Sequence, residues 1–136
     1  MNYETVMVFG VFDYLHKGHR YFLKQAKELG NKLIIIVARD SSVRLFKNKS
    51  PEWNELKRKE MLENYLPDAI VELGDEEQGR YNVVLEHKPG LICLGYDQQK
   101  LESDLKEKIS YGLLPEIPIM IIKPHNPEQY KSSKYV

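Results

Sequence analysis

Five short apolar runs are spread along the chain. They cover residues 5–9, 32–38, 69–73, 91–94 and 117–122. Two stretches within them, residues 34–37 and 119–122, contain only Ile, Val and Met. Unbroken apolar runs of this kind are typical of strands that are buried on both faces, as in a parallel sheet. The pattern therefore predicts five buried strands.

Stretches with helical spacing lie between the apolar runs. Apolar residues recur three or four positions apart over residues 21–29, 56–66, 83–87 and 101–109. Gly30 stands directly after the first stretch, where a glycine commonly ends a helix. Pro67, Pro89 and Gly112 stand just beyond the other three and are expected to stop them. We predict four helices that end near these residues.

The predicted strands and helices alternate throughout the chain. Such alternation indicates βαβ units, whose right-handed crossovers place helices on both faces of a parallel sheet. We predict an α/β fold, a doubly wound parallel five-stranded sheet with helices on both faces, in a single domain over residues 1–136. Ligands of such folds bind outside the carboxyl ends of the strands, where the strand order reverses. The first strand-to-helix turn is therefore the first place to expect a site.

The turn after the first predicted strand carries a glycine and two histidines. Gly10 follows the apolar run directly, and the absence of a Cβ would let a ligand approach the backbone. His16 and His19 are three residues apart, so the first turn of a helix would bring both rings to one side. With Lys17 and the unpaired N–H groups of a helix N-terminus, they predict a polyphosphate site. The same spacing fits metal ligands, but no cysteine or third histidine is near in the sequence, so we assign none.

Composition limits the partners and the cellular location that we expect for this protein. Lys and Arg number 20 and Asp and Glu number 20, so net charge gives no argument for a nucleic-acid or membrane partner. No apolar run approaches the roughly 20 residues of a membrane span, and the N-terminus shows no secretory signal. Cys93, the only cysteine, is flanked by apolar residues and is expected in the core. We expect a cytoplasmic protein that binds neither nucleic acid nor membrane.

Residues 10–19 read GVFDYLHKGH, which resembles the G-x-F-D-x-x-H-x-G-H signature of the cytidylyltransferase-like nucleotidyltransferases. Every fixed position matches, between a predicted strand and a predicted helix. The resemblance implies a Rossmann-like fold and transfer of a nucleotidyl group to a phosphate acceptor, with release of pyrophosphate. It implies that His16 and His19 contact the triphosphate, with Mg²⁺ or another divalent cation bridging the phosphates. For Asp13 it leaves two roles, orienting the loop or touching a metal-bound water, and we favour the first.

The resemblance also assigns a wider set of residues. Those assigned to nucleotide binding are Val8, Phe9, Gly10, Val11, Phe12, Asp13, His16, Gly18, His19, Gly95, Tyr96, Asp97, Ser132 and Ser133. Lys47 and Arg58 join the histidines as catalytic candidates, and Asp40, Lys47 and Lys49 are assigned to the acceptor. Lys47, Lys49 and Arg58 are also compatible with solvated surface charges.

The second signature of the family, R-T-x-G-I-S-T-T near the carboxyl end, is only partly represented. Ser132, Ser133 and Lys134 resemble a short serine-containing form of it, and Lys131 is the nearest substitute for its arginine. In the family a helix follows this signature, so the assignment of Ser132 and Ser133 depends on the short form alone.

Three further segments, residues 37–44, 74–77 and 94–98, resemble the archaeal-type FAD synthases. This favours an enzyme that transfers AMP from ATP to the phosphate of FMN, in a homodimer. Tyr14, Phe46, Trp53 and Tyr81 are candidates to stack on a flavin. One alternative keeps the chemistry but uses CTP and glycerol 3-phosphate, or ATP and a sugar phosphate of polysaccharide or lipopolysaccharide-core synthesis. Another is a nucleotide-binding protein without catalysis.

Overall fold

The computed structural model describes residues 3–47, 50–77 and 79–124, without the side chains of Phe46 and Lys47. The predictions for Lys49, Ser132 and Ser133, and those for the side chains of Phe46 and Lys47, lie outside the described residues.

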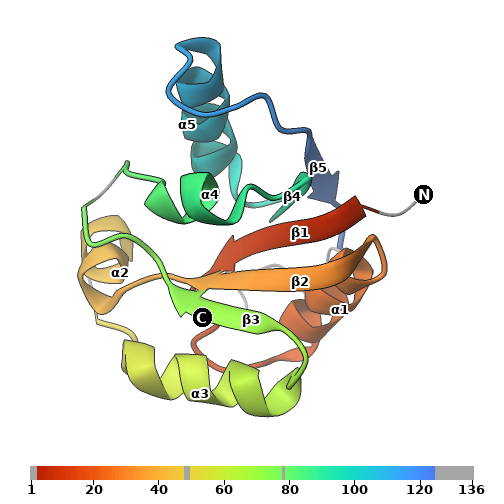
Figure 1. Ribbon diagram of the computed structural model, residues 1–136. Coiled ribbons are helices and arrows are strands. Elements are labelled where there is room, and N and C mark those ends of the chain that lie inside the picture. The colour runs from red at the N-terminus through yellow and green to blue at the C-terminus, as the bar shows by residue number, and fades with distance from the viewer. Residues whose placement is uncertain (1–2, 48–49, 78, 125–136) are drawn as a thin grey trace.

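Five parallel strands form one sheet (Figure 1). They are β1 (Tyr3–Gly10), β2 (Gly30–Val37), β3 (Ile70–Leu73), β4 (Leu91–Gly95) and β5 (Ile119–Ile122). Their order across the sheet is β3-β2-β1-β4-β5, and every neighbouring pair is parallel. Each strand lies on one of the predicted apolar runs, so the parallel five-stranded sheet of a Rossmann-like fold is confirmed.

Helices cover both faces of this sheet. They are α1 (Lys17–Lys27), α2 (Asp40–Lys47), α3 (Glu55–Tyr65), α4 (Asn82–His87) and α5 (Gln99–Ser110). Figure 1 shows α4 and α5 on one side of the sheet, α1 and α3 on the other, and α2 beyond the carboxyl end of β2. The doubly wound arrangement is therefore confirmed. None of the helices in the described ranges is long and apolar enough to cross a membrane.

Each face of the sheet has its own apolar core, because successive residues of a strand point to opposite faces. On β1, Val6 and Val8 belong to the core that includes residues of α1 and α3. Met7, between them, belongs to the core that includes residues of α4 and α5. Cys93 is fully buried in the first of these cores, and burial raises the pKa of its thiol to about 11. The predicted core position of Cys93 is confirmed.

The predicted role of Gly30 as a helix cap is wrong. α1 ends at Lys27, its cap residue Glu28 keeps a right-handed conformation, and Gly30 is the first residue of β2. A Cβ on Gly30 would lie 2.6 Å from Val6 Cγ2 and 2.9 Å from the carbonyl oxygen of Tyr3. The close approach of β1, and not a left-handed helix end, is what requires glycine here.

The hydrophobic pattern does not predict α2. Among its described side chains only Val43 is buried, and eight residues with one buried position are too few to establish a helical period. The helix begins at Asp40, just beyond the carboxyl end of β2. It therefore lies on the side of the sheet where the site is expected.

Candidate functional site

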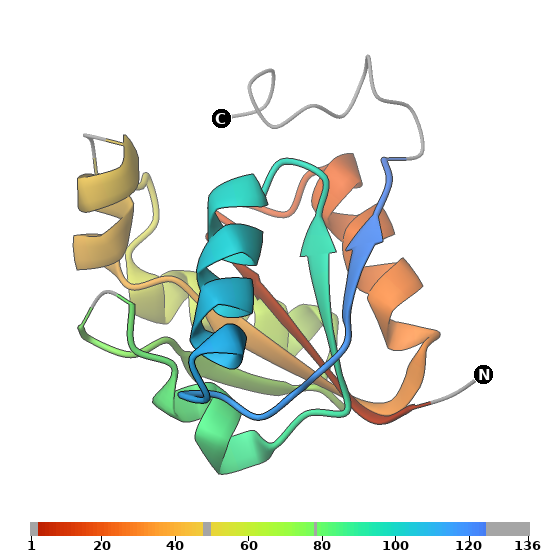
Figure 2. The same cartoon turned by 90° about the horizontal axis from the view of Figure 1, so that it is seen from above.

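The strand order reverses between β1 and β4, at the centre of the sheet. β1 leads into α1 on one face, and β4 leads into α5 on the other. Figure 2 shows β4 ending on the same side of the molecule as the start of α1. In folds of this class the ligand binds at this reversal, so the loops after β1 and β4 form the candidate site.

The turn after β1 is shaped by Gly10 and Phe12. Phe12 adopts a left-handed backbone conformation, with φ 52°, and its side chain is buried. A Cβ on Gly10 would lie 2.6 Å from the Phe12 ring. The space where a Cβ of Gly10 would stand is therefore filled by the Phe12 ring and not open to a ligand. Val8 and Phe12 are both buried, so neither side chain faces a ligand.

His16 forms the N-cap of α1. Its Nδ1 accepts hydrogen bonds from the backbone N–H groups of Gly18, at 3.1 Å, and His19, at 3.3 Å. The prediction that N–H groups at this helix end are unpaired is therefore wrong for these two. An Nδ1 that accepts two hydrogen bonds carries no proton, so neutral His16 has its proton on Nε2. Nε2–H is then the donor group of the neutral ring.

The rings of His16 and His19 are stacked, with centroids 3.6 Å apart and planes 19° from parallel. His19 Nδ1 lies 2.8 Å from the carbonyl oxygen of Tyr14, which fixes that nitrogen as the donor. Burial, and then the positive charge of Arg20, lower the pKa of His16, while the carboxylate of Asp97 acts in the opposite direction. His16 is therefore held neutral, which suits a ring stacked on a second imidazole.

Asp13 fastens the loop that precedes α3. Its two carboxylate oxygens accept hydrogen bonds from the backbone N–H groups of Glu52 and Trp53, each at 2.9 Å. These contacts are those of a residue that orients a loop, the role we favoured. Each of the two oxygens is thus engaged by a protein donor.

Arg58 faces the interior instead of a ligand. Its side chain is fully buried, and it donates from Nε to the Trp53 carbonyl (2.9 Å), from Nη1 to the Val11 carbonyl (2.8 Å) and from Nη2 to Asp40 Oδ1 (2.7 Å). This placement does not fit the prediction that Arg58 is a catalytic residue, because its guanidinium is engaged within the protein. Asp40, assigned to the acceptor, is likewise engaged by Arg58. Together with Asp13, these residues tie the signature loop to α2 and α3, and we call Asp13, Asp40 and Arg58 the brace.

Some of the other predicted residues lie at this site and others do not. Gly95 ends β4, and the exposed Asp97 acts electrostatically on His16, so the signature loop and this turn are brought together. Tyr14 lies edge-on to His16, with ring centroids 6.0 Å apart. Tyr81, a candidate to stack on a flavin, instead packs against Phe9, and its hydroxyl donates to Asp104.

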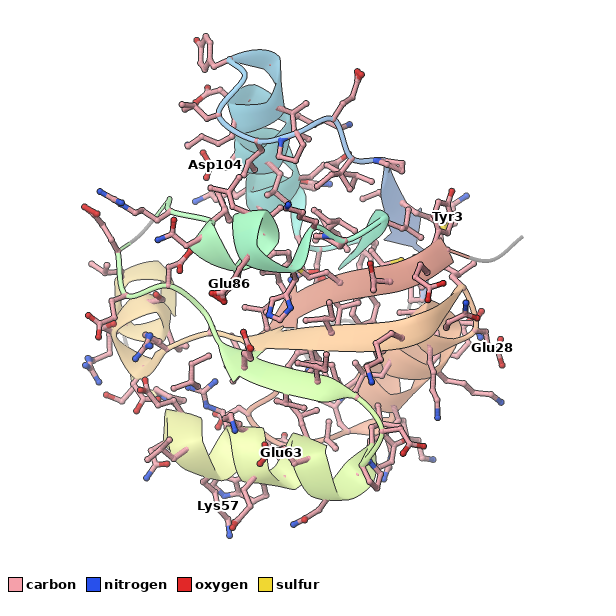
Figure 3. The ribbon with its side chains drawn as sticks, viewed as in Figure 1. Tyr3, Glu28, Lys57, Glu63, Glu86 and Asp104 are labelled. Carbon is pink, nitrogen blue, oxygen red and sulfur yellow. The ribbon has the colours of Figure 1, made fainter. Side chains whose placement is uncertain are left out.

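A separate cluster of possible metal ligands lies on α4 and β3. Ligand atoms of Glu72, Glu86 and His87 lie within 4.8 Å of one another, and His87 Nε2 is 2.8 Å from Glu72 Oε2. Figure 3 shows Glu86 on the side of α4 that is turned toward β2 and β3. The cluster is not part of the turns after β1 and β4. Its imidazole also makes it a poor match for Mg²⁺, which prefers oxygen ligands.

Comparison with known proteins gives the family. The sequence model described as "Cytidylyltransferase-like" matches residues 7–136. The chain belongs to the cytidylyltransferase-like family. His16 and His19 of this cytidylyltransferase-like protein lie within residues 10–19, the segment on which the resemblance was based.

Relatives of this cytidylyltransferase-like protein include archaeal proteins named FAD synthase. That of Pyrococcus abyssi is 39% identical over 134 residues, covering 96% of this chain and 88% of the relative. The FAD synthase of Aciduliprofundum boonei is 43% identical over 103 residues, covering 76% of this chain and 68% of the relative. A solved structure titled as a lipopolysaccharide core biosynthesis protein from Thermoplasma volcanium is 36% identical, with a TM-score of 0.80 over 92% of this chain and all of the other.

Sequence reasoning missed one residue at this site. Gln98 bridges the ends of β1 and β4 through its side-chain amide, as described below. The only signal for it was its position directly after the Gly95–Asp97 segment. Its partner Phe9 is 89 residues away along the chain, so no local pattern identifies the contact.

Proposed function

We propose that this protein transfers AMP from ATP to the phosphate of FMN, forming FAD and pyrophosphate. The observation that carries the proposal is the stacked histidine pair at the start of α1, in a chain whose relatives named FAD synthase are 36–43% identical. The strand reversal supports a nucleotide site beside this pair, because ligands of such folds bind at the reversal.

In this proposal the two histidines have different roles in binding the phosphates. In the proposed reaction an oxygen of the FMN phosphate attacks the α-phosphorus of ATP, and the bond from that phosphorus to the pyrophosphate oxygen breaks. Negative charge gathers on the phosphate oxygens, so fixed donors aimed at them lower the barrier. His16 is proposed to supply Nε2–H as such a donor, because its Nδ1 is held by the helix backbone. His19 is proposed to bind the same phosphates as an imidazolium, because its Nδ1–H donates to the Tyr14 carbonyl and only the protonated ring has a second donor at Nε2.

Magnesium is proposed to arrive with the triphosphate. Mg²⁺ is commonly held by substrate phosphates, water and one or two carboxylates, and it neutralises the charge of the phosphates. Asp13 is engaged by two backbone N–H groups, whereas Asp97 is exposed close enough to His16 to affect its pKa. Asp97 is therefore the described carboxylate that best fits a water-mediated or direct contact with the ion.

The other assigned residues keep their roles as parts of this proposal. Lys47, Lys49, Ser132 and Ser133 are proposed to bind the phosphates or the acceptor, as the family signature implies. Arg58 is proposed to act through the loop that it positions, and not on the substrate. A cytoplasmic homodimer remains our expectation, and sedimentation of the full chain as a monomer at working concentration would contradict the dimer.

A second candidate has one specific observation in its favour. The Thermoplasma volcanium structure, 36% identical with a TM-score of 0.80, is titled for lipopolysaccharide core biosynthesis. That title favours transfer of a nucleotidyl group to a sugar phosphate on the same fold. The histidine chemistry would be unchanged, because only the acceptor and base pockets would differ.

The test crosses two nucleotides with three acceptors. The full chain with Mg²⁺ is assayed for pyrophosphate with ATP or CTP against FMN, glycerol 3-phosphate and a sugar 1-phosphate, with products separated by chromatography. We expect pyrophosphate and FAD in equal amounts from ATP and FMN alone. Turnover with a sugar phosphate in place of FMN would support the second candidate. Binding of ATP without pyrophosphate from any pair would identify a non-catalytic nucleotide-binding protein.

A further inference from the structure

The ends of β1 and β4 separate at the strand reversal. The two strands pair from Val6 and Leu91 only as far as Val8 and Cys93. Phe9 is one residue beyond Val8 and Gly95 is two residues beyond Cys93, so the Phe9 carbonyl and the Gly95 N–H no longer have each other's strand as a partner. A partly buried peptide group in this position needs another hydrogen-bond partner, because leaving it unpaired is costly.

The side-chain amide of Gln98 satisfies both groups at once. Its Nε2 donates to the Phe9 carbonyl at 2.9 Å, and its Oε1 accepts from the Gly95 N–H at 2.8 Å. The amide therefore stands between the strand ends as a peptide group of an inserted strand would. Only a side chain with a donor at one end and an acceptor at the other can do this, and an ionised carboxylate offers acceptors alone.

Gln98 also shapes the turn that leads into α5. Its backbone N–H donates to the Gly95 carbonyl at 3.1 Å, and its own carbonyl accepts from the N–H of Glu102 at 3.0 Å. Over the same turn, a Cβ on Gly95 would lie 3.0 Å from Asp97 Oδ1 and 3.7 Å from Gln98 Oε1. The side chains of Asp97 and Gln98 are thus both folded back over Gly95, and the charge of Asp97 acts on His16.

We propose that Gln98 is a positioning residue that sets the distance between the two nucleotide-binding segments and thereby the affinity for ATP. Both ends of its amide are used within the protein, so it acts through the strand ends and not on the substrate. This inference rests on the proposed function only in taking ATP as the nucleotide. It requires no assumption about the acceptor.

The first test is Gln98→Glu, with Gln99→Glu as the matched control. Gln99 is the adjacent exposed residue, so the control makes the same chemical change outside the bridge. The dissociation constant of Mg-ATP is measured by calorimetry at about pH 8, and thermal unfolding is recorded for each protein. We expect Gln98→Glu to bind roughly 10- to 100-fold more weakly, the range for a broken buried hydrogen bond with an orphaned partner. Gln99→Glu should match the wild type.

The pH dependence separates this role from a general loss of packing. When the introduced carboxyl is protonated, its O–H can donate to Phe9 as the amide does. Asp97 in the same turn, Lys100 and Glu102 on α5, and His16, on which Asp97 acts, are the charged or ionisable groups in contact with this turn or next to it in the sequence. Because these groups are present in the wild type too, the ratio of the two dissociation constants is followed from about pH 8 to about pH 6. We expect the ratio to shrink as the pH falls.

A second variant keeps the test decisive if Gln98→Glu unfolds at high pH. Gln98→Met has similar length but neither donor nor acceptor, so its affinity for ATP should be reduced at every pH. Wild-type affinity in Gln98→Met, or a ratio for Gln98→Glu that does not change with pH, would overturn the inference. If the wild type binds ATP but makes no FAD, the proposed acceptor fails while the Gln98 comparison, read from ATP binding alone, still stands.

Discussion

Replacing Arg58 with methionine removes the guanidinium of the brace while keeping a side chain of similar length. The variant leaves three acceptors without their donor: the carbonyls of Trp53 and Val11 and the carboxylate of Asp40. The family resemblance makes Arg58 a catalytic candidate, and the structure shows it fully buried. The two views predict different phenotypes, so this variant distinguishes them.

The expected loss of stability follows from burial. Removing one partner of a buried ion pair costs about 3–5 kcal/mol. The Asp40 side chain is 24% exposed and can regain contact with water, so we expect a loss at the lower end of this range, about 3 kcal/mol. The two carbonyls that lose their donor add to this loss. The free energy of unfolding of a single domain is about 5–15 kcal/mol in total. For a domain of this size, each kcal/mol lowers Tm by about 3–5 °C, so we expect Tm to fall by at least about 10 °C.

The assay combines thermal unfolding by circular dichroism with ATP-dependent turnover well below both midpoints. Lys59→Met on the same helix is the control, because it removes only the partly exposed Lys59–Glu63 pair, worth about 0.3–0.5 kcal/mol. An unchanged Tm with lost turnover would refute the brace and restore Arg58 to direct contact with substrate. An unchanged Tm with normal turnover would show that the contacts of Arg58 have little energetic weight.

Three other predictions concern the turn after β1. His16→Ala and His19→Ala should each lower kcat by about 100-fold while the protein still folds, and near-normal steady-state turnover in both would exclude the proposed mechanism. Because burial and Arg20 lower the pKa of His16, its contribution to stability is present above about pH 6.5, the unfolded value, and is lost as the pH falls. The free energy of unfolding in urea should therefore fall more steeply between about pH 7 and pH 5 for the wild type than for His16→Gln. If the free energies of the two proteins changed in parallel with pH, that result would contradict the prediction. Gly10→Ala should destabilise by about 1–3 kcal/mol, since the new Cβ meets the Phe12 ring, and an unchanged urea midpoint would show that the ring moves aside freely.

The sheet was predictable because its signal is local. A continuous apolar run is visible wherever it lies in the chain, so β2 and β5 were evident without knowledge of their neighbours. The predicted burial is wrong for β5, because this strand lies at the edge of the sheet and its Met120 and Ile121 are exposed. α2 was missed because Val43 is the single buried residue among its described side chains. Gly30 was misread because its constraint comes from β1, and a sequence pattern does not show which strand lies alongside.

The site was predictable in its location but not in the direction of its side chains. The signature identified His16 and His19, and the structure places them together as stacked rings. The partners of Arg58 lie 5, 18 and 47 residues away, so its inward orientation depends on the assembled fold. The cap formed by His16 Nδ1 was also hidden, because histidine is outside the usual set of N-cap residues.

The brace holds residues 52 and 53 entirely through main-chain atoms: Asp13 binds their N–H groups, and Arg58 binds the Trp53 carbonyl. Every amino acid except proline supplies the same N–H and C=O groups at these positions. The side chains of Glu52 and Trp53 are thus free to change over evolution, or in the laboratory, without releasing the loop. Variation at these two positions therefore leaves the contacts of the brace, and the loop that it holds, unchanged.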